Sequence, residues 1–308
     1  SDSLRYKIYS LVKQSVSNEK DFVIKSEKYG IPQKRHRIII VGVREDIYKR
    51  PTSLIPSLDQ VSLESVIGRL PSIRSALNRS VRITKTIDGK KKRVYKNIDD
   101  SDALWCDLLN GFKKTVFSWN GFVEQDIFGA IKAPKHGTGS EYIECFNSID
   151  DNHPLKEWYV DPRFNGITNH ESRAHLIEDL KRYFFSSLYT KKYKAFPRLH
   201  DYAAHSKELM PDHENAASGK FNDRFRVQIR DIPATTITSH ISKDGHYFIH
   251  YDPKQCRSFT VREAARVQTF PDNYLFCGSR TQQFHQVGNA VPPLLAKQIG
   301  EIVKKLFV

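Results

Sequence analysis

The sequence predicts an α/β fold in which the edge of a sheet is joined to a larger region rich in strands. Residues 38–43 are nearly all apolar, as expected for a strand that is covered on both faces. Such a strand needs neighbours, and the segment that precedes it offers too few, so the sheet is predicted to be incomplete. Two hairpin patterns lie in the middle of the chain, and amphipathic helices close it.

The elements before the first hairpin follow from local patterns. Residues 3–16 are predicted to form a helix, because their apolar side chains recur at helical spacing. Residues 21–46 predict a strand, a Gly-Ile-Pro turn and a second strand. A linker comes next, and residues 63–73 predict a short helix that a proline ends.

Two hairpins and a longer helix are predicted in the middle of the chain. The first hairpin turns at Asp88-Gly89, and the second, within residues 221–251, turns at Asp244-Gly245. Between them, residues 171–188 predict a helix with Asn169 as its cap. Residues 101–168 are aromatic-rich and irregular, and no chemistry is assigned to them.

The last part of the chain predicts two helices joined by a loop. Thr260 and Glu263 have the spacing of a capping box, so a helix is predicted to begin directly after Thr260. Gly288 and Asn289 are interpreted as a tight turn, and the two prolines that follow suit the start of the closing helix. The apolar face of that helix consists of Leu295, Ile299, Ile302, Val303 and Leu306.

Four sequence patterns are more specific than this periodicity. T-x-R-E-A-A-R-x-Q-x-F-P-D followed by Q-x-G-N-A-V-P-P resembles the last two sequence blocks of the cytosine-C5 DNA methyltransferases. Upstream, G-I-P-Q-x-R-x-R and V-G-V-R resemble the block that comes just before the target recognition domain in that family. The resemblance covers the chain except residues 74–168, and it implies that the first strands lie at one edge of a doubly wound sheet.

This resemblance divides the chain into three parts. Residues 1–50 are expected to be the C-terminal strands of the catalytic domain, and residues 51–257 the target recognition domain. Residues 258–308 are expected to be closing helices that return to the catalytic domain. The predicted fold class is therefore α/β, with the edge of an incomplete doubly wound methyltransferase sheet and a mixed, strand-rich recognition domain.

The groups that methylate cytosine in this family are missing from the chain. A cysteine that follows a proline adds to the flipped base, a glutamate in Glu-Asn-Val supports the addition, and S-adenosylmethionine supplies the methyl group. Here no cysteine follows a proline, the only Glu-Asn pair continues to alanine, and no glycine-rich cofactor turn precedes Gln33. The chain is thus predicted to be the C-terminal part of such an enzyme, inactive alone, with an N-terminal catalytic half in cis or in trans.

Several residues that remain are expected to bear on the active site. Gln33, Arg35 and Arg37 alternate along a strand and can line one face. The resemblance implies that Arg37 reaches the flipped cytosine or its flanking phosphate and that Arg35 braces the acidic partner; the structural alternative is that both arginines pair with core acids. The resemblance also implies that Asn289 and Val291 help to close the S-adenosylmethionine pocket, whereas the alternative has Asn289 only serving the turn.

The expected partner is double-stranded DNA. The 308 residues carry 49 lysines and arginines against 35 acids, a formal net charge of +14, which suggests a polyanionic partner. A cationic run in the first hairpin is either a solvated face or a phosphate contact, and the second is favoured in a domain that holds DNA. The candidate DNA contacts are Gln33, Arg37, Lys90, Lys91, Lys92, Arg93, Arg226, Thr236, Thr238, His240 and Lys243.

Other readings stay open at this point. The chain could be a non-catalytic DNA-binding or regulatory module, or an RNA-binding relative, which the length of the recognition domain disfavours. Three arginines, Arg257, Arg262 and Arg266, are predicted to be structural, tying the recognition domain to the sheet. No metal site is predicted, since His246, His250 and Cys256 match no standard zinc spacing. The four cysteines without CxxC spacing, and the lack of any membrane span, predict a cytoplasmic protein with no membrane partner. The expected source is bacterial.

Overall fold

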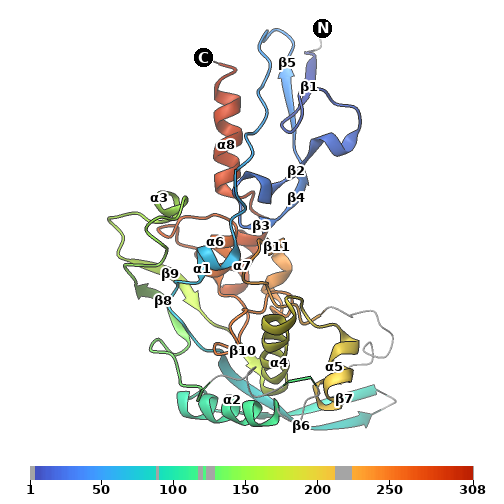
Figure 1. Cartoon of the computed structure of the whole chain (residues 1–308), viewed down its shortest axis with the longest axis vertical. Coiled ribbons are helices and arrows are strands. Elements are labelled where there is room, and N and C mark those ends of the chain that lie inside the picture. The colour runs from blue at the N-terminus through green and yellow to red at the C-terminus, as the bar shows by residue number, and fades with distance from the viewer. Residues whose placement is uncertain (1–3, 88–89, 117–120, 123–128, 212–223, 308) are drawn as a thin grey trace.

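The computed structural model describes residues 4–87, 90–116, 121–122, 129–211 and 224–307 (Figure 1). It is a mixed α/β fold in which every sheet is small. The strands are β1 (Tyr6–Ser10), β2 (Val23–Lys25), β3 (Gln33–Lys34), β4 (His36–Ile38), β5 (Ile40–Arg44), β6 (Ala76–Ile87), β7 (Lys90–Asn97), β8 (Gly139–Glu144), β9 (Gly166–Glu171), β10 (Ala174–Leu176) and β11 (Ala234–Thr235). The helices are α1 (Leu63–Ile67), α2 (Asp102–Val116), α3 (Lys156–Tyr159), α4 (Ile177–Tyr193), α5 (Leu199–His205), α6 (Val261–Val267), α7 (Arg280–Asn289) and α8 (Pro293–Lys304).

The first strands and the last helix lie together at one end of the molecule (Figure 1). β1 pairs antiparallel with β5, and β2 with β4. Apolar side chains of α8 join those of the strands and of the segment that follows them in a single small core. Its buried members are Leu11, Ile24, Tyr29, Ile31, Leu54, Leu295 and Ile302. The chain therefore returns at its C-terminal end to the strands with which it began.

Two expectations for this end are wrong. The predicted helix over residues 3–16 is a strand, because β1 pairs along its whole length with β5. Its aromatic and β-branched side chains suit a strand better than a helix, and pairing decides the outcome. Residues 38–43 were expected to form a strand covered on both faces. One face is uncovered, since Ile38 and Ile40 are each 56% exposed.

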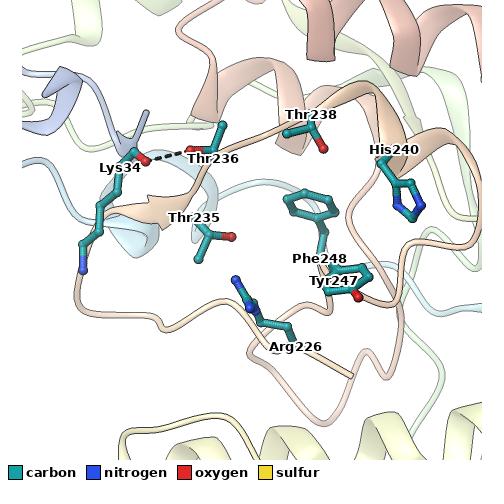
Figure 2. A pocket seen from close by; sticks show the side chains of 8 residues that line it. All are labelled: Lys34, Arg226, Thr235, Thr236, Thr238, His240, Tyr247 and Phe248. Atoms are coloured by element: carbon teal, nitrogen blue, oxygen red, sulfur yellow. Dashed lines mark hydrogen bonds between the residues drawn. The ribbon is translucent and has the colours of Figure 1, made fainter. Parts of the chain in front are cut away.

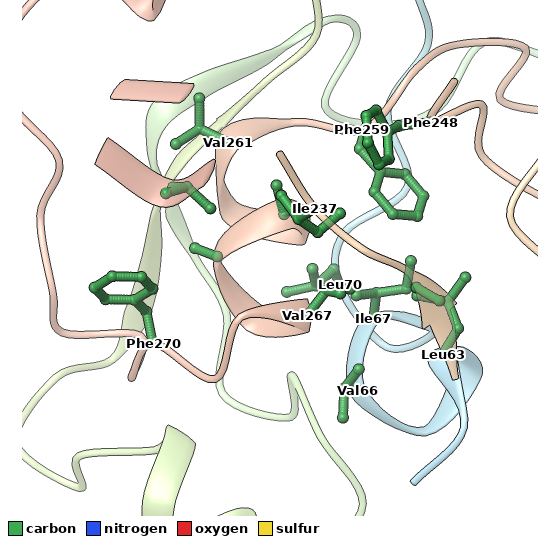
Figure 3. Close-up of a cluster of buried hydrophobic side chains, with 14 of the residues drawn as sticks. Leu63, Val66, Ile67, Leu70, Ile237, Phe248, Phe259, Val261, Val267 and Phe270 are labelled. Atoms are coloured by element: carbon green, nitrogen blue, oxygen red, sulfur yellow. The ribbon is translucent and has the colours of Figure 1, made fainter. Parts of the chain in front are cut away.

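The middle of the molecule is built around α6, all of whose residues are buried (Figure 3). The predicted capping box is confirmed: the Thr260 hydroxyl accepts from the amide of Glu263, and the Glu263 carboxylate accepts from the amide of Thr260. Helices α1 and α7 and strand β9 pack around α6. Figure 3 shows its side chains meeting those of α1 and of Ile237, Phe248 and Phe259.

Helix α7 was not predicted, and the proposed tight turn at Gly288 and Asn289 is wrong. These two residues are the last of α7, and the chain turns only at Ala290. Glycine is needed at position 288 for a different reason. A Cβ there would lie 2.3 Å from the backbone nitrogen of Ser239, so the missing side chain lets α7 approach that backbone closely.

The far end of the molecule contains the longest strands and helices. β6 pairs antiparallel with β7, which confirms the first hairpin, although its turn at Asp88-Gly89 lies outside the described residues. β10 pairs parallel with the other edge of β6. Helices α2 and α4 pack together here, and the core between them has Trp105, Leu109, Phe112, Leu180, Tyr183, Phe184, Phe185 and Leu188 among its buried members.

Three further expectations need correction. Helix α4 begins at Ile177, because the preceding residues form β9 and β10. Asn169 lies in β9, where its side chain bonds the backbone of Phe276 at 3.0 Å, so it caps no helix. The second predicted hairpin does not form within residues 224–251, which the structure describes. Its threonine segment pairs instead, as β11, with β3 near the start of the chain.

Three arginines on and beside α6 are fully buried, which confirms their structural role. Arg257 forms a two-pronged pair with Glu263 at 2.6 and 2.7 Å. Burial alone would raise the pKa of Glu263, but the Arg257 charge outweighs it and holds that pKa well below its usual range. Arg262 donates to the carbonyl of Thr168, and Arg266 to those of Val66 and Ser148.

Arg266 also pairs with the buried carboxylate of Asp272. Removing that carboxylate leaves a guanidinium in a dry interior without its counter-charge. We therefore expect Asp272→Ala to lower the free energy of unfolding by about 3–5 kcal/mol in urea denaturation. Asp46→Ala removes one partner of an exposed ion pair with Arg44 and should cost at most about 1 kcal/mol. Equal small losses for both variants would contradict a structural role for the buried pair.

Candidate nucleic-acid interface

A pocket of about 500 Å³ opens beside β11 and β3 (Figure 2). Its lining consists of Lys34, Arg226, Thr235, Thr236, Thr238, His240, Tyr247 and Phe248. Four predicted DNA contacts, Arg226, Thr236, Thr238 and His240, therefore line one cavity. These residues line one pocket although the segment that carries them does not form the expected hairpin. A contact role for them stays a prediction.

One wall of the pocket is joined to the first strands of the chain by a row of hydrogen bonds. β11 pairs parallel with β3, and the hydroxyl of Thr236 donates to the carbonyl of Lys34 at 2.7 Å. The guanidinium of Arg35 donates to the carbonyl of Ile237 at 2.9 Å. Segments about 200 residues apart in the sequence are thus held in fixed register at the pocket.

Gln33 lies inside this junction and is fully buried. Its side-chain oxygen accepts from the backbone amide of Ile237 at 3.0 Å, and its side-chain NH2 group donates to the side-chain oxygen of Gln268 at 2.6 Å and to the carbonyl of Val267 at 3.2 Å. Gln268 in turn donates to the carbonyl of Val287 in α7. The expectation that Gln33 contacts DNA is therefore corrected, because its amide is satisfied within the protein and has no exposed surface.

Arg35 and Arg37 diverge in their surroundings. Arg35 is partly buried, and this burial, followed by the neighbouring Arg37 charge, lowers the pKa of its guanidinium. Arg37 is exposed and donates to the carbonyl of His36 at 2.7 Å. Within the described residues no carboxylate forms an ion pair with either arginine, so the alternative of pairing with core acids is not found there. Arg37 keeps donors available at the surface.

The remaining candidates lie away from the pocket. Asn289 and Val291 are both exposed where α7 connects to α8, with Val291 at 52%. Lys243 is exposed just after the turn at Ser239–Ser242 and does not line the pocket. Among the residues that the structure describes, no three His, Cys, Asp or Glu side chains gather as a metal ion would need.

The predicted phosphate contacts follow β7 along the hairpin. Strand register places Lys92 opposite Lys85, and Arg93 opposite Thr84. A phosphate-binding role for this cationic run stays a prediction.

Sequence reasoning missed half of the pocket, namely Lys34, Thr235, Tyr247 and Phe248. Thr235 was overlooked because strict alternation places it on the opposite face from Thr236, whereas β11 lasts only two residues and then bends away. Tyr247 and Phe248 follow Gly245, whose φ of 77° turns the chain back toward the threonines. The Asp-Gly pair was the available signal, and it marks this turn correctly.

No helix in the described part of the chain combines the length and apolar character needed to cross a bilayer.

Comparison with known proteins identifies similar sequences along most of the chain. The family model described as C-5 cytosine-specific DNA methylase matches residues 19–305. The type II methyltransferase M.DdeI of Desulfomicrobium norvegicum is 38% identical over 294 residues, covering 91% of this chain and 52% of its own. M.Bpa9945I of Bacillus paralicheniformis, also a type II methyltransferase, is 38% identical over 206 residues, covering 64% of this chain and 43% of its own.

Among solved structures, a crystal structure described as a DNA modification methyltransferase of an E. coli prophage aligns with a TM-score of 0.48 at 18% identity. The alignment covers 98% of this chain and 61% of that one. The chain spans about half the length of the curated relatives it matches.

The junction at Gln33 yields a stability prediction. Gln33→Leu leaves the amide of Ile237 and the side-chain oxygen of Gln268 buried without partners. Since each such group costs about 1–3 kcal/mol, we expect the free energy of unfolding to fall by about 3 kcal/mol. Gln60→Leu makes the same change at an exposed glutamine and should stay within about 0.5 kcal/mol of the parent. A Gln33→Leu protein as stable as Gln60→Leu would show that the junction is dispensable.

Proposed function

Because the chain belongs to the C-5 cytosine-specific DNA methylase family, we propose that it is the C-terminal, target-recognising part of a cytosine-5 DNA methyltransferase. In this proposal it binds double-stranded DNA and completes an active site whose nucleophile lies in an N-terminal catalytic half, in cis or in trans. Residues 51–257 act as the target recognition domain. The named relatives are type II methyltransferases, which supports a role in modifying one defined DNA sequence.

The observation that carries the proposal is an apolar sheet face that is largely exposed in the described part of the chain. By register, Tyr6, Ile8 and Ile40 share one face of the β1–β5 pair, and each is 56% exposed. The opposite face turns Val43 into the core. A single sheet with one buried face and one exposed apolar face is typical of an interface whose partner is missing.

The partner that fits this face is the rest of a doubly wound sheet. Strands of such sheets are apolar on both sides because helices cover both faces. The relatives are about twice as long as the portion matched here, which leaves room for those strands and helices. The missing half would also supply the cysteine nucleophile and the supporting glutamate.

The cofactor fits only in part. S-adenosylmethionine supplies the methyl group when it is bound. This chain would contribute the amide of Asn289 and the apolar side chain of Val291, both exposed at the α7–α8 connection. One amide and one apolar contact are too few to hold a nucleoside cofactor, which agrees with a site lying mostly in the other half.

Arg37 is the residue of this chain proposed to act closest to the reacting base. Its guanidinium offers forked donors that can grip a carbonyl edge and a phosphate oxygen together. Its neighbour Arg35 is anchored to Ile237, so the strand that carries Arg37 is fixed to the wall of the pocket. DNA held in the pocket would thereby be placed in a defined position relative to Arg37.

Salt dependence tests the DNA-binding part of the proposal. The chain should bind duplex DNA with an affinity that falls as salt rises, because each neutralised phosphate adds about 0.9 to the log–log slope. Replacing Lys90, Lys91, Lys92 and Arg93 with serine should flatten that slope, as measured by fluorescence anisotropy.

The matched control removes the same number of charges elsewhere, by replacing Lys20, Lys114, Lys207 and Arg163 with serine. These four residues carry the same charge and lie outside both the hairpin and the pocket. The control should keep more of the parental slope than the hairpin variant. An unchanged salt slope for the hairpin variant would show that the cationic run is a solvated face without phosphate contacts.

Reconstitution tests the catalytic part. The pure chain should transfer no tritiated methyl group from S-adenosylmethionine to DNA, and adding the N-terminal half should restore transfer. In the reconstituted enzyme Arg37→Lys keeps the charge but loses the fork, so turnover should fall about 10²-fold while DNA affinity is retained. The chain carrying Arg37→Ala should melt close to the parental temperature, because Arg37 is exposed.

Arg163→Lys is the matched control, since its side chain is 88% exposed and far from the first strands in the sequence. It should leave turnover unchanged. Methyl transfer by the pure chain would disprove the division of labour proposed here. If Arg37→Lys turns over at the parental rate, the assignment of Arg37 to the active site is wrong. If no N-terminal half restores methyl transfer, the chain is better explained as a non-catalytic DNA-binding module.

A further inference from the structure

We propose that the pocket beside β11 and β3 reads a guanine–cytosine base pair through its major-groove edge, with Arg226 donating to the guanine and Thr235 accepting from the cytosine. This inference rests on the proposed function, because it names the base pair that a DNA-recognising part of the enzyme would select. It assigns opposite hydrogen-bonding roles to two side chains that line the same cavity.

Arg226 is held in place by its backbone. Its amide donates to the carbonyl of His246 at 2.8 Å, and its carbonyl accepts from the amide of Ile249 at 3.1 Å. Both main-chain groups are thus committed to the neighbouring segment. The side chain therefore departs from a fixed point on the rim of the pocket, and Figure 2 shows it directed toward Thr235.

Two aromatic rings orient the guanidinium itself. Its central carbon lies 4.8 Å from the ring centre of Phe196 and 5.7 Å from that of Tyr247. A cation attracted to ring faces loses freedom in its flat group before any ligand arrives, so less entropy is lost on binding. A guanidinium held in this way is suited to recognise two acceptors that lie side by side in one plane.

Thr235 has the opposite polarity, and the reason is its contact with Gln228. The NH2 group of Gln228 donates to the carbonyl of Tyr247 at 2.8 Å, which identifies the other end of that amide as its oxygen. The backbone amide and the hydroxyl of Thr235 both approach this oxygen, at 2.9 and 3.1 Å. The Thr235 hydroxyl must therefore be the donor in that bond, and its own oxygen is left only to accept from a ligand.

A forked donor and an acceptor are together the complement of a guanine–cytosine pair. In the major groove guanine shows two adjacent acceptors, N7 and O6, and its paired cytosine shows the N4 donor. Adenine instead places a donor next to N7, so one prong of the guanidinium would meet another N–H group. The pocket should consequently prefer guanine over adenine at this position.

A phosphate group is the other acceptor that suits a forked donor. The acceptor-only oxygen of Thr235 argues against it, because that oxygen would face an anion. Phosphates also lie on the outside of the duplex, where exposed cations reach them, whereas Arg226 is only partly exposed. These two observations favour a base edge.

The test begins with selection of binding sequences by the 308-residue chain from a randomised duplex library. We expect one invariant guanine–cytosine pair or more in the selected sites. Replacing that guanine with 7-deazaguanine, which lacks the N7 acceptor, should weaken binding about fivefold or more, within the range expected for base contacts. Replacing it with inosine, which keeps N7 and O6, should change the affinity less than twofold.

Variants then assign the contact to residues. Arg226→Gln and Arg226→Lys should each lose about tenfold or more of the discrimination between guanine and adenine at that position. Thr235→Val keeps the shape of threonine but removes the accepting oxygen, and it should lose part of the same discrimination. Arg230→Gln, the same change at an arginine four residues away that lies outside the pocket and pairs with Glu64, should leave discrimination intact.

The outcomes separate this inference from the proposed function. If Arg226→Gln weakens binding to all duplexes equally and lowers the salt slope by about 0.9, the residue contacts a phosphate and the inference fails. Selected sites without an invariant guanine–cytosine pair also overturn it, while salt-dependent binding still supports the proposed function. A chain that binds no duplex even at low salt overturns both. Should Arg226→Gln fail to fold, the base-analogue duplexes and Thr235→Val test the inference by themselves.

Discussion

The buried charges on and beside α6 are the constraint on which the rest of the structure depends. Arg257, Arg262 and Arg266 are buried, and each forms an ion pair with a buried carboxylate: Arg257 with Glu263, and both Arg262 and Arg266 with Asp272. Their remaining donors reach carbonyl groups of segments that are far apart in the sequence, near residues 66–73, 148 and 168. Val66 belongs to α1 and Thr168 to β9, whereas Ile73 and Ser148 lie outside helices and strands. The guanidinium groups therefore join elements and connecting segments that share no sheet.

A second network joins this centre to the first strands and to the pocket. From β3, the side chain of Gln33 bonds Ile237 and the end of α6, and Gln268 continues the chain of amides to α7. All of these amides are buried, so each lost bond would leave a polar group in an apolar setting. The strand that carries Arg37 and the wall that carries the threonines are consequently one rigid unit. The base-pair recognition and the base placement proposed above would be coupled through this unit.

The sequence allowed prediction of those features that local chemistry decides. The capping box at Thr260 and the hairpin of β6 and β7 follow from residue types at fixed spacing, and the structure confirms them. The three arginines that were expected to be structural are buried. The helix expected over residues 3–16 and the hairpin expected within residues 221–251 failed for a common reason. In both cases the segment pairs with a strand that is distant in sequence, β5 for the first and β3 for the second. Thr236, Thr238 and His240 still line one pocket, whereas Gln33 could be identified as buried only once its three partners were known.

The pairing of β11 with β3 has a consequence for how new specificities arise in such proteins. The proposed recognition segment pairs with the backbone of β3 and bonds the side-chain amide of Gln33, so it should not work when transplanted as an independent module. Its threonines would lose their register in a host that presents another side chain at that position. Exchange of this segment between relatives should therefore succeed where donor and recipient share β3. Natural variation should accumulate at the rim of the pocket and spare the junction between β11 and β3. Shuffling of specificity would then be governed by a contact that never touches DNA.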